Sequence, residues 1–207
     1  MEIDTTLWIL TALAGFVAGL IDSIVGGGGL VLTPAMLNLH PTLTILQAIA
    51  TQRTSSILGT SVAAWNYLRN IRIERYIILP ACIAALSASA FGVQFAKKMD
   101  PDILKWTVLS ICVVLALYTA LRKDLGLKEE RRFHPKHETI AAVSIGAATG
   151  FYNGLIGPGT GTIMVFAFVS FMGLDFLRSS AVSKAANVSA DLSSWTVLLL
   201  SGFVFWV

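Results

Sequence analysis

The stretch GFVAGLIDSIVGGGGLVLTP, residues 15–34, decides how this chain folds. Asp22 is its only charged residue, and four consecutive glycines, Gly26 to Gly29, interrupt it. The apolar run that contains it, residues 5–39, is about 35 residues long. One straight helix of that length would extend about 52 Å, which is more than one bilayer crossing requires. Because glycine disfavours a helix interior, we predict a helical hairpin or re-entrant pair broken at these glycines.

The composition indicates an integral membrane protein. Of the 207 residues, 55% are hydrophobic and 13% are charged, and the mean hydropathy is +0.73. A typical globular domain carries about 25% charged residues. Most of the charges fall in four clusters, at residues 2–4, 69–75, 97–105 and 122–138. We therefore expect an all-α polytopic transmembrane protein, which excludes a soluble enzyme domain, a disordered chain, a disulfide scaffold and a nucleic-acid-binding protein.

The remaining apolar runs divide into membrane segments. We predict helices at residues 45–68, 76–96, 106–121 and 176–207. A further run, residues 139–174, is broken at GPGTG, residues 157–161, as the first run is broken at its glycines.

The basic clusters predict the topology of the chain. Basic residues are enriched in residues 69–75 and 122–138, so we assign both loops to the cytoplasm and residues 97–105 to the outside. The N-terminus is then outside if residues 5–39 form a hairpin, and inside if they cross once. We prefer the hairpin.

A shift of 131 residues aligns the two broken runs as an internal repeat. Four glycines then align with four others: Gly15, Gly19, Gly26 and Gly28 with Gly146, Gly150, Gly157 and Gly159. Asp22 aligns with Asn153, and Arg53 with Lys184. We predict a first repeat at residues 1–122, a basic cytoplasmic connector at 123–138 and a second repeat at 139–207. Since the first copy ends on the side opposite its start, the two repeats should be inverted in topology.

Two cations and the glycine breaks predict an anion-binding site. Arg53 and Lys184 lie within apolar helices, where a charge costs about 2.5 to 3.5 kcal/mol and requires a partner or a wet cavity. The alternative is snorkelling to the membrane interface. Helices opening at Leu30 and Thr162 would direct their positive ends toward the centre. For the glycines the alternative is close helix packing.

The predicted substrate-binding residues combine glycine amides, small polar side chains and the two cations. They are Gly26, Gly27, Gly28, Gly29, Thr51, Arg53, Asn153, Gly157, Gly159, Thr160, Gly161, Lys184 and Asn187. Gln52 and Ser55 are further polar groups that could ligate an oxyanion. Asp22 and Asp191 are candidates for carrying a coupling proton, or alternatively for pairing with the two cations.

Nothing in the sequence indicates an enzyme, a cofactor or a metal site. The GPGTG stretch lacks the Lys-Ser/Thr ending and the preceding strand of a phosphate-binding loop. His40, His134 and His137 are expected in loops and not as metal ligands. The expected partners are a small anion and the lipid bilayer, with no nucleic acid, and a homo-oligomer is an open alternative.

Three sets of motifs resemble the TauE/SafE sulfite-exporter family. They are the stretch quoted at residues 15–34, ATQRTSS at residues 50–56, and GFYNGLIGPGTG at residues 150–161 with AVSKAAN at 181–187. The resemblance implies a multi-pass permease of the cytoplasmic (inner) membrane. Its substrates would be small sulfur oxyanions of the sulfite, thiosulfate or organosulfonate type, and proton coupling is an option. The alternative is a non-transporting membrane sensor or assembly subunit.

The second repeat is shorter than the first. It stops before counterparts of residues 76–121, and the chain ends within the apolar run 201–207. The family usually has two four-helix halves, so we expect a C-terminally truncated duplicate. The alternative is that a partner protomer occupies the position of the missing counterparts of residues 76–121.

Overall fold

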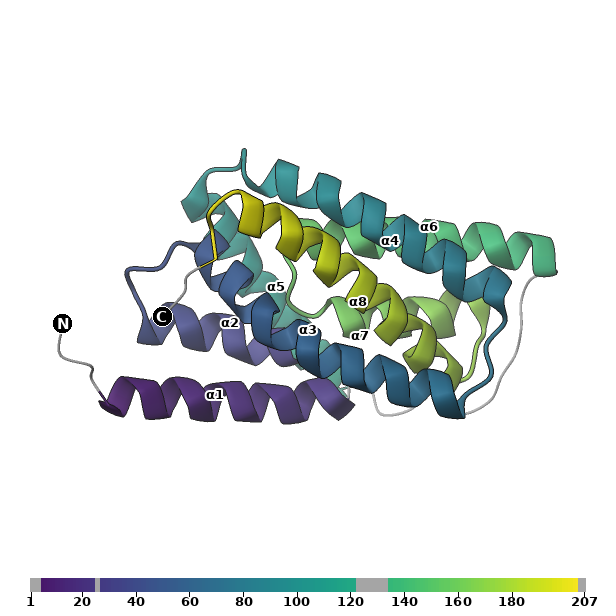
Figure 1. Ribbon diagram of the computed structural model, residues 1–207, viewed down its shortest axis with the longest axis horizontal. Helices are drawn as coiled ribbons and strands as arrows, with labels where there is room; N and C mark the ends of the chain where they lie inside the picture. Colours follow the sequence, from purple (N-terminus) through teal and green to yellow (C-terminus); the bar gives the residue numbers. More distant parts are fainter. Residues whose placement is uncertain (1–4, 25–26, 122–133, 205–207) are drawn as a thin grey trace.

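A computed structural model describes residues 5–24, 27–121 and 134–204, and within these ranges the chain forms eight α-helices, one π-helical segment and no strand. The elements in order are α1 Thr5–Ile24, α2 Gly28–Leu39, α3 Ile45–Asn70, α4 Arg75–Ala96, α5 Pro101–Leu121, α6 Pro135–Leu155, α7 Thr160–Ala167, the π-helix η1 Phe168–Met172, and α8 Phe176–Leu200. The predicted all-α fold is confirmed (Figure 1).

Local capping explains several helix boundaries. Helix α3 begins after a capping box in which Thr44 and Gln47 bond each other's backbone N–H groups, and α8 begins after Asp175, whose carboxylate accepts the N–H of Arg178. Both starts agree with the predicted segments. Helix α8 ends at Leu200, before Gly202 in the left-handed conformation.

Other predicted boundaries are wrong by a few residues. Helix α5 begins at Pro101 and not at residue 106, because the Asp100 carboxylate accepts the N–H groups of Asp102 and Ile103. Helix α6 begins at Pro135, which suits the first helical position, so His137 lies in a helix and not in a loop.

The two short helices also open earlier than predicted. Helix α2 opens at Gly28 and not at Leu30, and α7 opens at Thr160 and not at Thr162. The reason is that the last two residues of each stretch, Gly28 and Gly29 or Thr160 and Gly161, belong to the first turn of the helix, so each break is shorter than the glycine-rich stretch. Gly26 and connector residues 122–133 lie outside the described residues.

The helix boundaries follow the 131-residue register. Helices α1 and α6 end at Ile24 and Leu155, and α3 and α8 begin at Ile45 and Phe176. Each pair is 131 residues apart. Figure 1 shows α3 and α8 side by side, running in opposite directions. The inverted relation of the two repeats stays a prediction.

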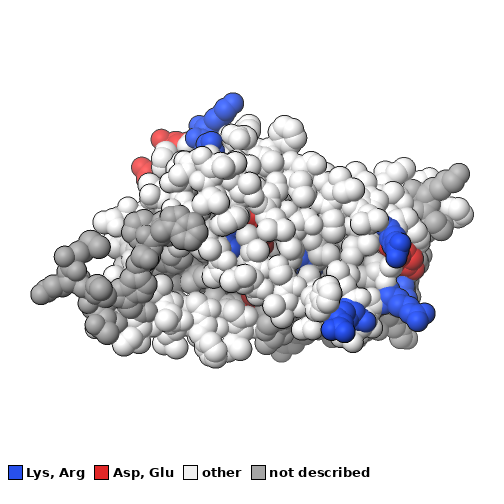
Figure 2. All heavy atoms as spheres, in the orientation of Figure 1, with Lys and Arg blue, Asp and Glu red and all other residues white. Residues whose placement is uncertain are grey.

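The exterior is apolar around the middle of the molecule. Large hydrophobic side chains are exposed on several helices, among them Leu58, Trp65 and Phe91. Charged residues gather toward the two ends of the long axis, and the band between them shows only a few charged atoms among uncharged ones (Figure 2). This arrangement suits a protein surrounded by lipid.

Two described helices, Arg75–Ala96 and Pro101–Tyr118, are long and apolar enough to cross a membrane. Three apolar helices are shorter, at Ile9–Asp22, Gly28–Leu39 and Thr160–Met172. Helices α3 and α8 are long, but their hydropathy is low because they bury polar side chains. On α8 these are Ser179, Ser180, Ser183, Lys184, Asn187, Asp191 and Ser194.

The interface between α4 and α6 is built from small residues. A Cβ at Gly146 or Gly150 would lie 2.5 Å from the carbonyl oxygen of Ala81 or Ala85, respectively. Such backbone contact is typical of membrane helices with small residues four positions apart. For the glycines of α6, close packing is therefore sufficient explanation. The aligned Gly15 and Gly19 of α1 have no described atom within 4 Å of their Cβ positions.

Gly19 and Gly150, which align in the repeat, allow a matched test of stability. We expect Gly150→Ala to destabilise the protein by about 1 to 3 kcal/mol, because the backbone of Ala85 cannot yield to the added methyl group. Gly19→Ala should be neutral or stabilising by up to about 1 kcal/mol, since alanine is the better helix former. Thermal unfolding in detergent checks both variants. Equal losses of stability would contradict the α4–α6 packing.

Candidate functional site

A polar cavity, here called the central cavity, lies where the two broken runs meet α3 and α8. Its volume is about 330 Å³, including the space that opens to solvent. Its lining is Asp22, Gly29, Gln52, Arg53, Ser56, Gly157, Pro158, Gly159, Thr160, Gly161, Asn187 and Asp191. Most of the predicted site residues therefore lie together, although they come from distant parts of the sequence.

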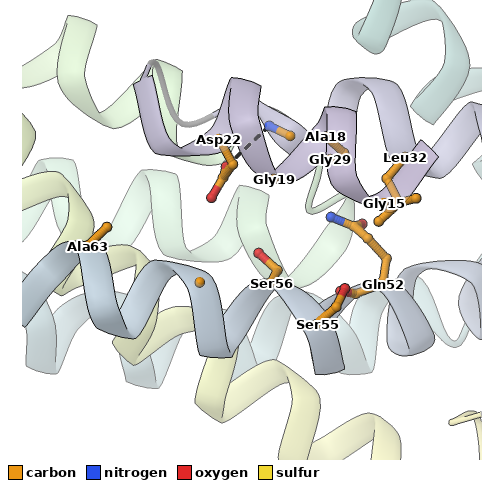
Figure 3. A pocket seen from close by; sticks show the side chains of 12 residues that line it. Gly15, Ala18, Gly19, Asp22, Gly29, Leu32, Gln52, Ser55, Ser56 and Ala63 are labelled. Carbon is orange, nitrogen blue, oxygen red and sulfur yellow. Dashed lines mark hydrogen bonds between the residues drawn. The ribbon is translucent and has the colours of Figure 1, made fainter. Parts of the chain in front are cut away.

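A second cavity, the vestibule, adjoins the central cavity between α1, α2 and α3. Its volume is about 540 Å³, again including open space. Small residues such as Gly15, Gly19, Gly59 and Ala63 line much of it. In Figure 3, Asp22 from the α1 side and Gln52 and Ser56 from α3 face the space between these helices. The two cavities share Asp22, Gly29, Gln52 and Ser56, so they lie on either side of these residues.

Arg53 lines the central cavity and carries one nitrogen without a hydrogen-bond partner. Its side chain is 2% exposed, and its Nη2 donates to the backbone oxygen of Asn153 in the last turn of α6. Its Nη1 is buried without a hydrogen-bond partner. The carboxylate of Asp191 interacts with the guanidinium electrostatically. Because a buried donor without an acceptor is costly, Nη1 marks a position where an acceptor would be favourable.

Lys184 makes the equivalent contact in the other repeat. Its Nζ donates to the backbone oxygen of Asp22 at 2.6 Å and lies 3.8 Å from that residue's Oδ2. Asp22 and Asn153 occupy the aligned positions near the ends of α1 and α6. Each cation therefore caps the end of a broken helix, where carbonyl groups lack partners and the dipole is negative. Snorkelling does not describe either residue, because Lys184 is 5% exposed and Arg53 is 2% exposed.

Asp191 is fixed by two amides. Its Oδ1 accepts from Asn153 Nδ2 at 2.8 Å, and its Oδ2 accepts from Asn187 Nδ2 at 3.0 Å. The hydroxyls of Ser89 and Ser194 in turn donate to Asn153 Oδ1 at 3.2 and 3.3 Å. A buried network in which each member is bonded holds its groups rigidly, so the carboxylate has one orientation relative to Arg53.

Helix α7 opens on the cavity. Gly157 and Gly159 precede it with φ of +90° and +81°, which favour glycine. The hydroxyl of Thr160 donates to the Gly157 oxygen at 2.6 Å. Because Thr160 and Gly161 line the cavity in the first turn of α7, its positive dipole end faces the same space as Arg53.

The other predicted residues lie around the cavity or away from it. Asn153 and Lys184 are buried behind its wall, bonded to Asp191 and Asp22. Gly28 lines only the vestibule, where its N–H donates to Asp22 Oδ1 at 3.2 Å. Gly27 lies against Thr162 of α7, and Thr51 is not part of either lining.

Two lining residues, Ser56 and Pro158, were not predicted. The repeat register could have found Ser56, because it aligns with Asn187, which was predicted. No cluster of three or more histidine, cysteine or carboxylate side chains suited to a metal occurs among the described residues.

Broken helices that meet at a buried charged cavity, in a bundle with an apolar exterior, define a membrane transport protein. The family model described as Sulfite exporter TauE/SafE matches residues 11–207. The chain belongs to this family, and it is a membrane transporter and not an enzyme.

Curated relatives agree with this assignment. The chain is 31% identical to a Sinorhizobium protein named probable membrane transporter protein ORF9, over 93% of this chain and 72% of the relative. It is 30% identical to a probable membrane transporter protein of Haemophilus influenzae, over 100% of this chain and 79% of the relative. It is 27% identical to the probable membrane transporter protein YfcA of Escherichia coli, over 97% and 71% of the two chains. No solved structure matches the chain significantly.

Alanine substitutions at two glycines distinguish the effect of the close contact with Arg53 from the effect of backbone strain. Gly157 and Gly202 both have positive φ, so alanine at either position costs about 1 to 2 kcal/mol. A Cβ at Gly157 would also lie 2.8 Å from Arg53 Nη2, whereas at Gly202 no described atom lies within 4 Å. We expect Gly157→Ala to lower the thermal unfolding temperature in detergent more than Gly202→Ala does. Equal decreases would contradict the close approach of Arg53.

Proposed function

We propose that the protein is a multi-pass permease of the cytoplasmic membrane that moves small sulfur oxyanions, of the sulfite, thiosulfate or organosulfonate type, through the central cavity. One observation carries this proposal, namely the unpartnered Nη1 of Arg53, a buried cation that lines the cavity. The first turn of α7 adds a positive dipole end to the same space. Guanidinium groups and helix N-termini are the groups that bind tetrahedral oxyanions in proteins.

The adjacency of the two cavities supports a route for the anion. Asp22 and Gln52 lie between the vestibule and the central cavity, so movement of these side chains would connect the two spaces. The second repeat would provide the opposite exit if the repeats are inverted. The antiparallel arrangement of α3 and α8 supports that inversion. In such folds alternating access moves one repeat against the other around a central site.

The ends of the helices support a multi-pass topology. Arg178, near the start of α8, pairs with Glu74 in the loop between α3 and α4 at 3.6 Å. Arg69 lies in the last turn of α3 and Arg72 in that loop, so this end is cytoplasmic by the positive-inside rule. At the far ends of α4 and α8, Lys97 donates to Ser201 at 2.9 Å. Helices α4 and α8 thus run the full length between the two ends.

Transport in reconstituted vesicles tests the proposal. We expect saturable uptake of sulfite, thiosulfate or methanesulfonate. Arg53→Gln should reduce it about tenfold or more, since a hydrogen bond to a charged group is worth about 1.5 to 3 kcal/mol. Arg69→Gln is the matched control, because Arg69 lies on the same helix but is exposed beside Trp65.

The outcome also separates the permease from its alternative. A folded protein that binds no anion and shows no saturable flux would support a sensor or assembly subunit. Unchanged flux in Arg53→Gln would contradict the assigned role of Arg53.

Proton coupling is a separate part of the proposal. Asp191 is 4% exposed and faces Arg53, so a proton on this carboxylate would change the charge beside the anion. We expect a transmembrane pH gradient to accelerate uptake, and Asp191→Asn to abolish that acceleration while anion exchange without a gradient continues. Uptake that is equal with and without the pH gradient would contradict proton coupling but would not contradict the permease function.

A further inference from the structure

The charges around the central cavity cancel. Its lining contains one cation, Arg53, and two carboxylates, Asp22 and Asp191. The ammonium of Lys184 lies against Asp22 and adds the second positive charge. Among the described residues, two positive and two negative groups thus surround the space, and their net charge is close to zero. This differs from a site in which two cations jointly attract an anion.

The donors that remain for a ligand are few. Lys184 is engaged by the backbone oxygen of Asp22 and lies close to its carboxylate. Arg53 Nη2 is engaged by the Asn153 oxygen, and the amide groups of Asn153 and Asn187 are engaged by Asp191. The uncharged amide of Gln52 and hydroxyl of Ser56 also line the cavity, so Arg53 Nη1 is the charged donor that remains among the described lining residues. The guanidinium of Arg53 already faces the carboxylate of Asp191, so each further negative charge on a ligand enters a site without surplus positive charge among the described groups.

We infer that the central cavity selects monovalent tetrahedral oxyanions, namely sulfonates and hydrogen sulfite, over dianions of the same shape such as sulfate and thiosulfate. This inference rests on the proposed function and narrows its substrate class. A second negative charge on the ligand would face the carboxylates of Asp22 and Asp191 without a second free cation. Like charges repel strongly where water is scarce, so the dianion is rejected.

The vestibule favours the sulfonates among these ligands. A sulfonate carries its charge at one end and an organic group at the other. With the charged end at Arg53, the organic group would extend past Asp22 and Gly29 toward the vestibule. There the lining is largely apolar and includes Ala18, Leu32 and Ala63.

Asp22 sets the charge preference in this scheme. Its carboxylate lies at the junction of the two cavities and cancels the charge of Lys184. Asp22→Asn removes the negative charge but keeps the size of the side chain, an oxygen for the N–H of Gly28, and the backbone oxygen that binds Lys184. The variant cavity would gain one net positive charge.

Methanesulfonate and sulfate provide the test, because they are nearly the same size and differ by one charge. In vesicles containing the wild-type protein, we expect methanesulfonate to compete for labelled sulfite uptake at least about tenfold better than sulfate or thiosulfate. Asp22→Asn should shift this preference toward the dianions by about tenfold. Asp102→Asn, an exposed carboxylate on α5, is the matched control and should not shift it.

A double variant distinguishes the effect of the altered charge from a structural effect of the Asp22→Asn substitution. Asp22→Asn combined with Lys184→Gln restores the neutral balance, so the preference for methanesulfonate should return. Equal or better competition by sulfate in the wild-type protein would overturn the inference, as would a double variant that keeps the dianion preference of Asp22→Asn. Absence of saturable flux for every anion would instead overturn the proposed function.

Discussion

The structure depends on the need to satisfy helix ends that lie inside an apolar bundle. A helix that stops there leaves carbonyl groups without partners, and no bulk water is available to bond them. Arg53 and Lys184 meet this need, because each donates to a backbone oxygen near the end of a broken helix in the other repeat. The breaks and the buried cations therefore require each other. Loss of either cation would expose a helix end, and loss of a break would leave a cation without its acceptor.

The buried cations in turn require buried carboxylates, and these determine the character of the central helices. Asp191 is held by Asn153 and Asn187, and Asp22 lies beside Lys184. As a result α8 carries its polar side chains inward, and it is not among the described helices that are apolar enough to cross a membrane. Of the two helices that meet that criterion, α5 is largely exposed, whereas α4 packs against α6 and α8 and donates from Ser89 to Asn153. Hydropathy thus misses α3 and α8, the helices that carry the buried cations.

Much of the fold could be predicted from the sequence. The starts of α3 and α8 and the end of α4 at Ala96 follow from capping residues and changes in polarity. Contacts between the repeats could not be predicted, because Arg53 and Asn153 are a hundred residues apart and no local pattern joins them. The different roles of the aligned glycines could not be predicted from the sequence either. Gly150 packs on a backbone while Gly19 faces open space, although both occupy the same position in the repeat.

This difference shows why a duplicated sequence does not produce a symmetric site. The aligned residues Asp22 and Asn153 accept through the same backbone atom, but one side chain is a carboxylate and the other an amide. Asp22 therefore cancels the charge of Lys184, whereas Asn153 directs Asp191 and leaves Arg53 with a free nitrogen. Among the described residues, left-handed glycines precede α7, at Gly157 and Gly159, whereas Gly27 before α2 has a φ of −111°. One repeat thus contributes the free guanidinium and the other the helix end beside it, so a single anion site lies between two unequal halves.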